Sequence, residues 1–448
     1  MHITQKSAQN IVNEMKASIH RDINIMDENG VILASTDPAR RGKLHQGALA
    51  IIREGLDCLT VRQDEPERGI QRGVNLPVTL RGQLEGVIGI TGEPEEVAVF
   101  GEIIRHMTEI MLEAAYQQEE LELLQRSRSL FVENWLFDAQ PEQVVFTMNA
   151  THALNLAIKT LVKPGGRAVI SGFEHNAVLR PLHHLGAEII VAGRRLFDPA
   201  DTISAFDRAI TPGTSAVICT HVSNVFGYIL PVEEIAALCR ARGVPFVLDA
   251  SQSAGLLPVR LAELGADFIG MPGHKALYGP QGTGLLLCAR MPDTLLEGGS
   301  GSASRLPDMP PELPDHAEAG TQNVCGICGL AAGLRFVRQQ TPQRLLAHEI
   351  RLRRLLASML EDIPGIRLFT GEAQSGTLSL CAAQTDCEAL AARLASEGIC
   401  VRAGLHCAPL AHESAGTLET GTVRFSLSAF NTEREILEIA KHIRSCLK

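Results

Sequence analysis

Seven short apolar segments lie along the middle of the chain, with helical patterns between them. Short apolar runs bounded by turn residues are typical of strands that are buried on both faces of a parallel sheet. The spacing predicts an α/β fold with one large, mainly parallel seven-stranded sheet over 138–335, followed by a smaller α+β domain over 336–448. The strands of the large sheet are expected at 143–146, 167–170, 188–191, 215–219, 245–248, 267–269 and 284–288.

Two of the expected strands end beside residues of complementary charge. Asp249 ends the run Val244–Leu248, and Lys275 follows the segment 267–269 within Gly273-His-Lys. Because the carboxyl ends of parallel strands meet at one edge of a sheet, both side chains are expected there, where open α/β folds bind ligands. Pyridoxal phosphate binds covalently to a lysine, and an aspartate on its pyridinium nitrogen tunes it as an electron sink. Either residue alone is more typical of a surface lysine or a helix-capping aspartate, but the pair predicts a pyridoxal-phosphate enzyme.

Polar residues after other expected strands extend this site. Thr151 begins a helix whose free backbone amides suit a phosphate group, and His175 can stack on the pyridine ring. Asn224 and Gln252 can donate hydrogen bonds to the phenolic oxygen of the cofactor. Each residue is also common in an ordinary cap or turn, so it is their order along the chain, each at a strand end, that indicates a cofactor site.

These residues lie in motifs that resemble a known family. Residues 138–448 resemble the class V aminotransferases, a family of fold-type I pyridoxal-phosphate enzymes, and within it the cysteine desulfurase and selenocysteine lyase branch. The matching motifs are Asn149-Ala-Thr-His-Ala-Leu-Asn155, Glu174-His-Asn-Ala-Val178, His221-Val-Ser-Asn224, Asp249-Ala-Ser-Gln252, Gly273-His-Lys-Ala-Leu-Tyr-Gly279, Glu318-Ala-Gly-Thr-Gln-Asn323, Arg402-Ala-Gly-Leu-His-Cys407-Ala and Thr422-Val-Arg-Phe-Ser426.

The resemblance implies a role for each site residue. Lys275 would attach the cofactor, His175 would stack on its ring, and Arg424 with Arg402 would bind the substrate carboxylate. Gly320 and Thr321 would reach the phosphate bound by a partner subunit, which implies a homodimer. The implied cofactor-binding residues are Ala150, Thr151, His175, Asn224, Asp249, Gln252, His274, Lys275, Gly320 and Thr321.

Cys407 separates the branches of the family. In desulfurases a cysteine thiolate attacks the sulfur of the bound L-cysteine, which leaves a persulfide and releases alanine. An attacking thiol must be accessible and readily deprotonated, and His406 and Arg402 are expected to supply positive charge. The resemblance thus implies Lys275, His175 and Cys407 as catalytic residues. A class V aminotransferase or a selenocysteine lyase is the alternative activity, and a buried structural cysteine is the alternative role of Cys407.

The first 137 residues follow a different pattern. A helix over 8–19, a hairpin about 27–30, a helix near 44–55 and strands near 74–80 and 84–91 are expected there. A helical pattern then runs from Pro94 to about residue 137. A seven-residue repeat within it predicts either a seam that pairs two chains or a helix packed on its own sheet. The repeat consists of Phe100, Ile104, Met107, Met111 and Ala114.

This part resembles the sugar-diacid recognition domain at the front of carbohydrate-diacid regulators. The resemblance implies a PAS-like sensor domain over 1–137 that binds a sugar diacid or a small hydroxy acid. Such a ligand needs cations and amide donors, for which Arg41, His45 and Asn75 are the candidates. The matching segments are Asp22–Gly30, His45–Leu49, Gly73–Pro77, Gly86–Pro94 and Leu130–Phe137.

Two departures from the desulfurase pattern bear on activity. The strand, turn and arm with which desulfurases normally begin are not found before residue 138, and His152 stands where many relatives have an acid. Both departures favour an impaired enzyme. The alternative function is therefore a regulatory protein that binds a ligand through its sensor domain and has a weak or inactive cofactor domain.

Composition argues against several other classes of protein. The net charge is −10 and no cluster of basic residues occurs, which argues against nucleic-acid binding. No apolar run approaches the roughly 18 residues of a membrane span, and eleven scattered cysteines without a signal peptide indicate the cytoplasm. Cys325-Gly-Ile-Cys328 has no second ligand pair, so helix packing is expected there and no metal site.

Overall fold

The computed structural model describes residues 5–19, 21–65, 70–80, 82–132 and 139–447. The chain forms two compact units, Met1–Glu122 and Leu123–Lys448. The sequence change predicted at 137/138 lies outside the described residues.

The first unit is an antiparallel sheet with helices on it. The sheet order is β2-β1-β5-β4-β3. In the turn between β1 and β2 the Asp27 carboxylate accepts hydrogen bonds from the backbone N–H groups of Asn29 and Val31, which explains the predicted hairpin. The elements are α1 (Gln5–Ile19), β1 (Ile23–Met26), β2 (Ile32–Ser35), α2 (Gln46–Glu54), β3 (Leu59–Val61), β4 (Gly73–Leu80), β5 (Gln83–Thr91) and α3 (Pro94–Val132).

One face of α3 packs on the sheet of the first unit. Val97 and Ile104 are fully buried there in one cluster with Leu76 of β4. Gly101 lies between them on the same face, and a Cβ atom at that position would lie 2.8 Å from Leu76 Cδ1. The missing side chain therefore lets the helix approach the strand closely.

A second apolar face of α3 is exposed, and this corrects the predicted repeat. Phe100 and Met107 are 46% and 44% exposed, whereas Ile104 is buried and Met111 packs against the core of the first unit. The sequence pattern had combined residues from both faces into one seam. Packing on the unit's own sheet is thus confirmed for one face of the helix, and pairing with a second chain stays a prediction for the other face.

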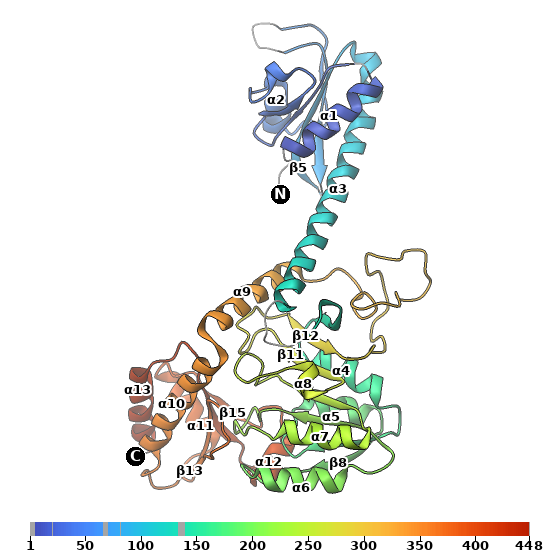
Figure 1. Ribbon diagram of the computed structural model, residues 1–448. Helices are drawn as coiled ribbons and strands as arrows, with labels where there is room; N and C mark the ends of the chain where they lie inside the picture. The colour runs from blue at the N-terminus through green and yellow to red at the C-terminus, as the bar shows by residue number, and fades with distance from the viewer. Residues whose placement is uncertain (1–4, 20, 66–69, 81, 133–138, 448) are drawn as a thin grey trace. The chain divides into compact units, whose positions relative to one another are not determined.

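The second unit is built on a seven-stranded mixed sheet, as predicted (Figure 1). Its order is β6-β12-β11-β10-β9-β7-β8; β12 runs antiparallel to both of its neighbours, and the other pairs are parallel. Alternate residues of one strand enter different cores, as Val145 and Phe146 do, so both faces are buried and the strands read as unbroken apolar runs. The strands are β6 (Val144–Thr147), β7 (Arg167–Ser171), β8 (Glu188–Ala192), β9 (Thr214–Thr220), β10 (Phe246–Asp249), β11 (Phe268–Pro272) and β12 (Gly284–Cys288).

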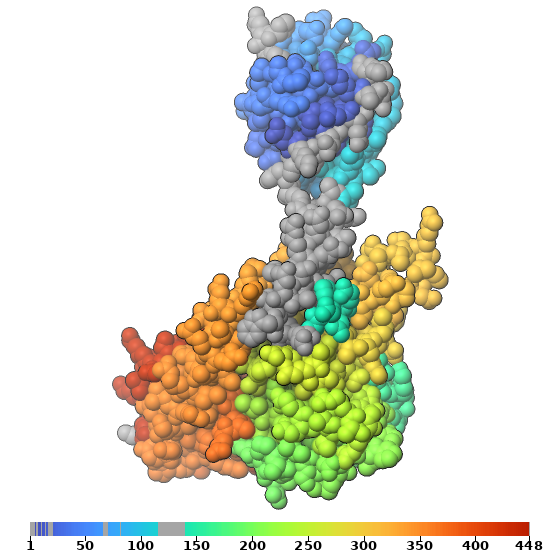
Figure 2. Space-filling view, in the orientation of Figure 1, coloured from blue at the N-terminus to red at the C-terminus, as the bar shows by residue number. Residues whose placement is uncertain are grey.

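Helices cover both faces of this sheet. Side chains of α4 and α5 belong to one core cluster and those of α6, α7, α8 and α9 to the other. The segment 289–323 between β12 and α9 contains no helix or strand and projects from the surface (Figure 2). The helices are α4 (Ala150–Leu161), α5 (Asn176–His184), α6 (Pro199–Ala209), α7 (Val232–Arg242), α8 (Leu261–Leu264) and α9 (Val324–Gln340).

The C-terminal part adds a four-stranded antiparallel sheet of order β13-β14-β16-β15. The predicted strands and helices of this part are present, and the short helix α12 is additional. The elements are α10 (Pro342–Leu360), β13 (Ile366–Phe369), β14 (Thr377–Ala382), α11 (Cys387–Ser396), β15 (Arg402–Gly404), α12 (Pro409–Ala415), β16 (Thr422–Ser426) and α13 (Glu433–Cys446).

Gly255 fits tightly against the segment that contains Lys275. Its φ is +92°, and a Cβ atom would lie 2.2 Å from the carbonyl oxygen of Ala276. We expect Gly255→Ala to lower the free energy of unfolding by roughly 2–4 kcal/mol, since backbone strain and overpacking add. Gly243→Ala is the matched control, because Gly243 has φ +64° and open space around it, and it should cost only about 1 kcal/mol. Urea denaturation measures both; equal losses would contradict the predicted contact.

Candidate active site

Asp249 and Lys275 lie at the ends of two neighbouring parallel strands. Asp249 is the last residue of β10 and pairs in register with Gly270 of β11, five residues before Lys275. The Asp249 side chain is buried, and its Oδ1 accepts a hydrogen bond of 2.9 Å from Ser251 N–H. Burial lowers the pKa of Lys275, while the charge of Asp249 opposes this shift. A lysine amine that loses its proton readily is suited to covalent attachment to an aldehyde.

Lys275 lines a cavity of 540 Å³ together with Gln252, His274 and Arg424. A local turn fixes the lysine segment, because Tyr278 N–H donates to the carbonyl oxygen of Lys275 at 2.9 Å. The predicted residues Gln252 and His274 therefore do lie beside the lysine. Among the described residues the Lys275 side chain forms no hydrogen bond, so its amine is available at the cavity.

His175 is the N-cap of α5, and this fixes its ring. Its Nδ1 accepts a hydrogen bond of 3.0 Å from Ala177 N–H. Burial lowers the pKa of His175, the nearby charges of Lys275 and Arg402 lower it further, and Asp249 opposes them. The ring is therefore a neutral, oriented imidazole near the Asp249–Lys275 pair, which suits stacking on an aromatic cofactor.

Arg402 and Arg424 face each other across two strands. They are direct partners in the antiparallel pairing of β15 with β16. Arg424 Nη1 donates to the carbonyl oxygen of Asn224 at 2.8 Å, and its Nε is buried without a partner among the described residues. Burial and the charge of Arg402 lower the pKa of Arg424. Two adjacent guanidinium groups that form no ion pair among the described residues suit the carboxylate of an amino acid.

The loop that contains Cys407 is held against the large sheet by two hydrogen bonds. Asn176 N–H donates to the carbonyl oxygen of Cys407 at 2.7 Å, and Asn224 Nδ2 donates to that of His406 at 2.8 Å. Cys407 itself is exposed. His406 and Cys407 have φ of 50° and 59°, a conformation that is strained for residues other than glycine and occurs often at functional sites.

His406 does not have the electrostatic role that the sequence suggested. Its ring is buried, with Nε2 3.1 Å from both the hydroxyl and the carbonyl oxygen of Thr422. Burial, together with the charge of Arg424, lowers the pKa of His406 to about 3. His406 is therefore neutral near pH 7 and supplies no positive charge to Cys407. Cys407 interacts electrostatically with Arg424, whose pKa it raises.

Asn224 differs in part from its expected role. One of its two amide N–H groups is used on the carbonyl oxygen of His406, which leaves the second N–H for a ligand. The side chain thus joins the large sheet to the Cys407 loop, a contact that sequence order does not reveal.

The N-terminus of α4 has the geometry expected of a phosphate site. Asn149 caps the helix through a 3.0 Å bond from His152 N–H, and Ala150 and Thr151 form its first turn. A Cβ atom on Gly284 would lie 2.8 Å from the Asn149 backbone, so only glycine allows this approach. The residues present therefore fit an anionic, lysine-bound cofactor: amides for a phosphate, a carboxylate for a ring nitrogen and an unpaired amine.

Gly320 and Thr321 are not brought to the lysine within one chain. Both are exposed, and Thr321 lines a different cavity of 190 Å³ with Met148 and His152. His152 Nδ1 accepts a hydrogen bond of 3.3 Å from Met148 N–H, and burial lowers its pKa. Their proposed contact with a partner subunit stays a prediction.

Two buried carboxyl groups near the site were not expected from the sequence. Glu174 is fully buried; its Oε1 accepts from Ser171 Oγ and Thr220 N–H, and its Oε2 has no partner among the described residues. Glu349 of α10 lines the 540 Å³ cavity. Burial raises the pKa of each to about 8, so both are mainly protonated at pH 7. Glu174 stands in a matched motif, but only the tertiary structure shows its burial.

Two of the three predicted sensor residues lie together in the first unit. His45 caps α2 through Nδ1, and a Cβ atom on Gly47 would lie 3.2 Å from the His45 ring and 3.1 Å from Asn75 Nδ2. Asn75 is buried, and its Oδ1 has no partner among the described residues. Burial and the charge of Arg40 lower the pKa of His45 to about 4. Arg41 is exposed. The charge that acts on His45 is that of the neighbouring residue Arg40.

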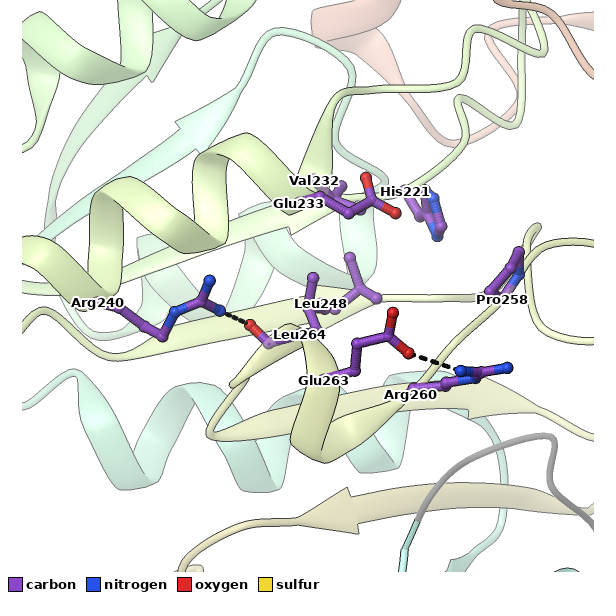
Figure 3. Close-up of a pocket in the computed structure, with 9 residues that line it drawn as sticks. All are labelled: His221, Val232, Glu233, Arg240, Leu248, Pro258, Arg260, Glu263 and Leu264. Atoms are coloured by element: carbon purple, nitrogen blue, oxygen red, sulfur yellow. Dashed lines mark hydrogen bonds and ion pairs between the residues drawn. The ribbon is translucent and has the colours of Figure 1, made fainter.

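A separate cavity of 80 Å³ lies between α7 and α8 (Figure 3). His221 forms one of its walls, and the guanidinium groups that line it already have partners: Arg260 pairs with Glu263 at 2.8 Å, and Arg240 donates to Leu264. Lys275 is not among its lining residues. This cavity is therefore not the predicted active site.

Other site classes find no support in the described part of the chain. No group of three His, Cys, Asp or Glu side chains among the described residues could hold a metal ion. No helix among those residues is long and apolar enough to cross a membrane.

Two family models match the chain. The model described as aminotransferase class V matches residues 100–439, and the model described as “Putative sugar diacid recognition” matches residues 3–135. Residues 100–135, which belong almost entirely to α3, are therefore matched by both. The class V match begins well before residue 138, where the sequence change was predicted.

Similar proteins of known family support the match to class V aminotransferases. The chain is 34% identical over 320 residues to a probable cysteine desulfurase of Mycolicibacterium paratuberculosis, covering 68% of this chain and 46% of that protein. It is 32% identical over 320 residues to a probable cysteine desulfurase of Methanothermobacter thermautotrophicus, covering 67% and 78%. The chain thus spans about half the length of the first relative and over three quarters of the second.

A solved structure agrees in fold. The apo cysteine desulfurase from Thermococcus onnurineus NA1 matches with a TM-score of 0.66 and 28% identity, covering 74% of this chain and 85% of that one. The shared fold is that of fold-type I pyridoxal-phosphate enzymes, and the residues around Lys275 fit that cofactor. With a family model that covers most of its length, the chain belongs to the aminotransferase class V family of pyridoxal-phosphate-dependent enzymes.

Proposed function

We propose that this protein is a cysteine desulfurase that converts L-cysteine to L-alanine and leaves the sulfur as a persulfide on Cys407. The observation that supports it most directly is that the exposed Cys407 lies on a loop bonded to Asn176 and Asn224, two residues of the cofactor edge. An aminotransferase has no need of a thiol at this place. Relatives and a structural neighbour named as cysteine desulfurases support the same activity.

The proposed reaction balances without an added oxidant. The C–S bond of L-cysteine breaks, an S–S bond forms at Cys407 Sγ, and one thiol proton ends on the Cβ of the released alanine. The cofactor, when bound, supplies the electron sink that weakens bonds in the substrate. The outcome is that the substrate carbon is reduced while the transferred sulfur is oxidised.

The chain's own residues hold the reactants in place. Arg424, with Arg402 beside it, would bind the substrate carboxylate, and Asp249 would hold the protonated ring nitrogen of the cofactor. Lys275 exchanges protons with the substrate, because burial lowers its pKa and makes its proton easier to remove. His175, neutral and fixed by its cap, supports the ring. Positioning of this kind accounts for a large part of enzymatic rate enhancement.

The first unit is proposed to be a sensor for a small sugar diacid or hydroxy acid, with His45 and Asn75 as ligand contacts. The family match over 3–135 supports this proposal. A homodimer is proposed because Gly320 and Thr321 lie away from Lys275 in one chain. A cytoplasmic location is proposed because all eleven cysteines are free.

The second candidate is a regulatory protein with a weak cofactor domain. The presence of a sensor match, and of His152 where relatives have an acid, favours it. It predicts cofactor binding with little L-cysteine turnover, so sulfide release by the wild-type protein in the second experiment below separates the candidates.

Replacing Lys275 with alanine should abolish covalent binding of the cofactor, because no other lysine among the described residues lines the 540 Å³ cavity. Purified wild-type protein incubated with pyridoxal phosphate should show a visible absorption band and a borohydride-reducible adduct on Lys275. Mass spectrometry of the reduced peptide locates the adduct. An adduct on another lysine would contradict the assignment.

Replacing Cys407 with serine should leave the cofactor absorption band unchanged and abolish persulfide formation. Sulfide release from L-cysteine in the presence of a thiol reductant should fall by at least about a hundredfold, because the sulfur then has no acceptor in the chain. Cys400→Ser is the matched control, since Cys400 is also exposed but is not in the loop that contains Cys407. Undiminished sulfide release in Cys407→Ser would exclude the desulfurase mechanism.

Replacing Arg424 with lysine should raise the KM for L-cysteine by roughly 10–100-fold, because a bidentate charged contact is worth about 1.5–3 kcal/mol. Arg402→Lys should change KM less, because Arg402 is exposed whereas Arg424 is half-buried. Steady-state kinetics measure both, and an unchanged cofactor spectrum controls for folding. A larger effect at Arg402 would reverse the two roles.

A further inference from the structure

We propose that the exposed apolar face of α3 in the first unit is an interface with a second copy of this chain. This face, the outer stripe, consists of Val99, Phe100, Ile103, Met107 and Ile110, which are 44–68% exposed. They make up five of the fourteen large hydrophobic residues exposed in the described part of the chain. Contiguous exposed apolar patches of this kind usually mark interaction sites.

The spacing of the outer stripe is that of a coiled-coil seam. Phe100, Ile103, Met107 and Ile110 follow one another in steps of three, four and three, so that Phe100 repeats at Met107 and Ile103 at Ile110. A seven-residue repeat keeps these side chains on one line along the helix. The inner face of α3 cannot provide this seam, because Val97 and Ile104 are buried against the unit's own sheet.

Charged side chains are kept off the outer stripe. Glu102, Arg105 and Glu109 lie on a third face of α3, where Arg105 pairs with Glu102 at 2.7 Å and with Glu109 at 3.4 Å. Near the start of the helix, Glu95 and Glu96 pair with Arg62 and Arg21 of the same unit. Two outer stripes can therefore meet without burying these acidic groups unpaired.

A second copy of the same helix is the occupant that matches this surface. A seam with a seven-residue repeat needs a partner helix with the same repeat, because each side chain enters a hole between four residues of the facing helix. An identical α3 has that repeat by construction, as a symmetric interface requires. The stripe spans about three helical turns, from Val99 to Ile110. The proposed contact does not depend on the proposed enzymatic activity.

Photocrosslinking of the full chain tests the proposal. The photoreactive residue benzoylphenylalanine replaces Met107 on the outer stripe, and in a matched control it replaces Leu44, which is 58% exposed on the same unit but off the stripe. Chains with two different affinity tags are co-expressed, so that a product carrying both tags joins two copies. We expect Met107 products to carry both tags, to join α3 to α3 by peptide mass spectrometry, and to exceed Leu44 products several-fold.

A second variant tests whether the Met107 crosslink depends on the outer stripe. Ile103→Glu with Ile110→Glu places charges in the seam and should lower the Met107 crosslink about tenfold, while Leu44→Glu should leave it unchanged. Circular dichroism and melting temperature confirm that each variant is folded. The proposal is overturned if Met107 crosslinks stay within one copy, reach residues outside α3, or form no more often than from Leu44. It is also overturned if the folded double variant keeps the wild-type yield.

Discussion

Burial of the seven-stranded sheet on both faces is the constraint on which the active site depends. Helices cover each face, so alternate residues such as Val145 and Phe146 enter two different cores. Burying an unpaired polar group between these layers destabilises the fold. The polar groups therefore gather where the strands end. Asp249 and Lys275 come together because β10 and β11 are parallel neighbours. The chemistry of the site therefore follows from the packing of the sheet.

Removal from water then sets the charge state of the site. It lowers the pKa of Lys275 and His406 and raises that of Glu174 and Glu349. Each shift moves the group toward its neutral form, as desolvation requires. The positive charge near Cys407 comes from a strand of the small sheet and not from its neighbour in sequence.

Helix α3 serves two surfaces at once. Its inner face completes the core of the first unit, and its outer stripe remains exposed. Both family models match most of this helix, so the part that matches the sensor family and the part that matches the enzyme family share one continuous element. If two copies meet at the outer stripe, their contact lies on a helix that the class V family model also matches.

The sequence by itself determined the seven strands, the Asp249–Lys275 pair and the family, because apolar period and residue order are local properties. It also placed Arg402 and Arg424 in one site. Only the tertiary structure decided which residues of α3 face the sheet, since apolar residues on two faces give one mixed pattern in the sequence. It alone showed that His406 is neutral, because burial and hydrogen-bond partners depend on segments far apart in the chain. A residue's type is written in the sequence, but its solvation is set by what packs around it.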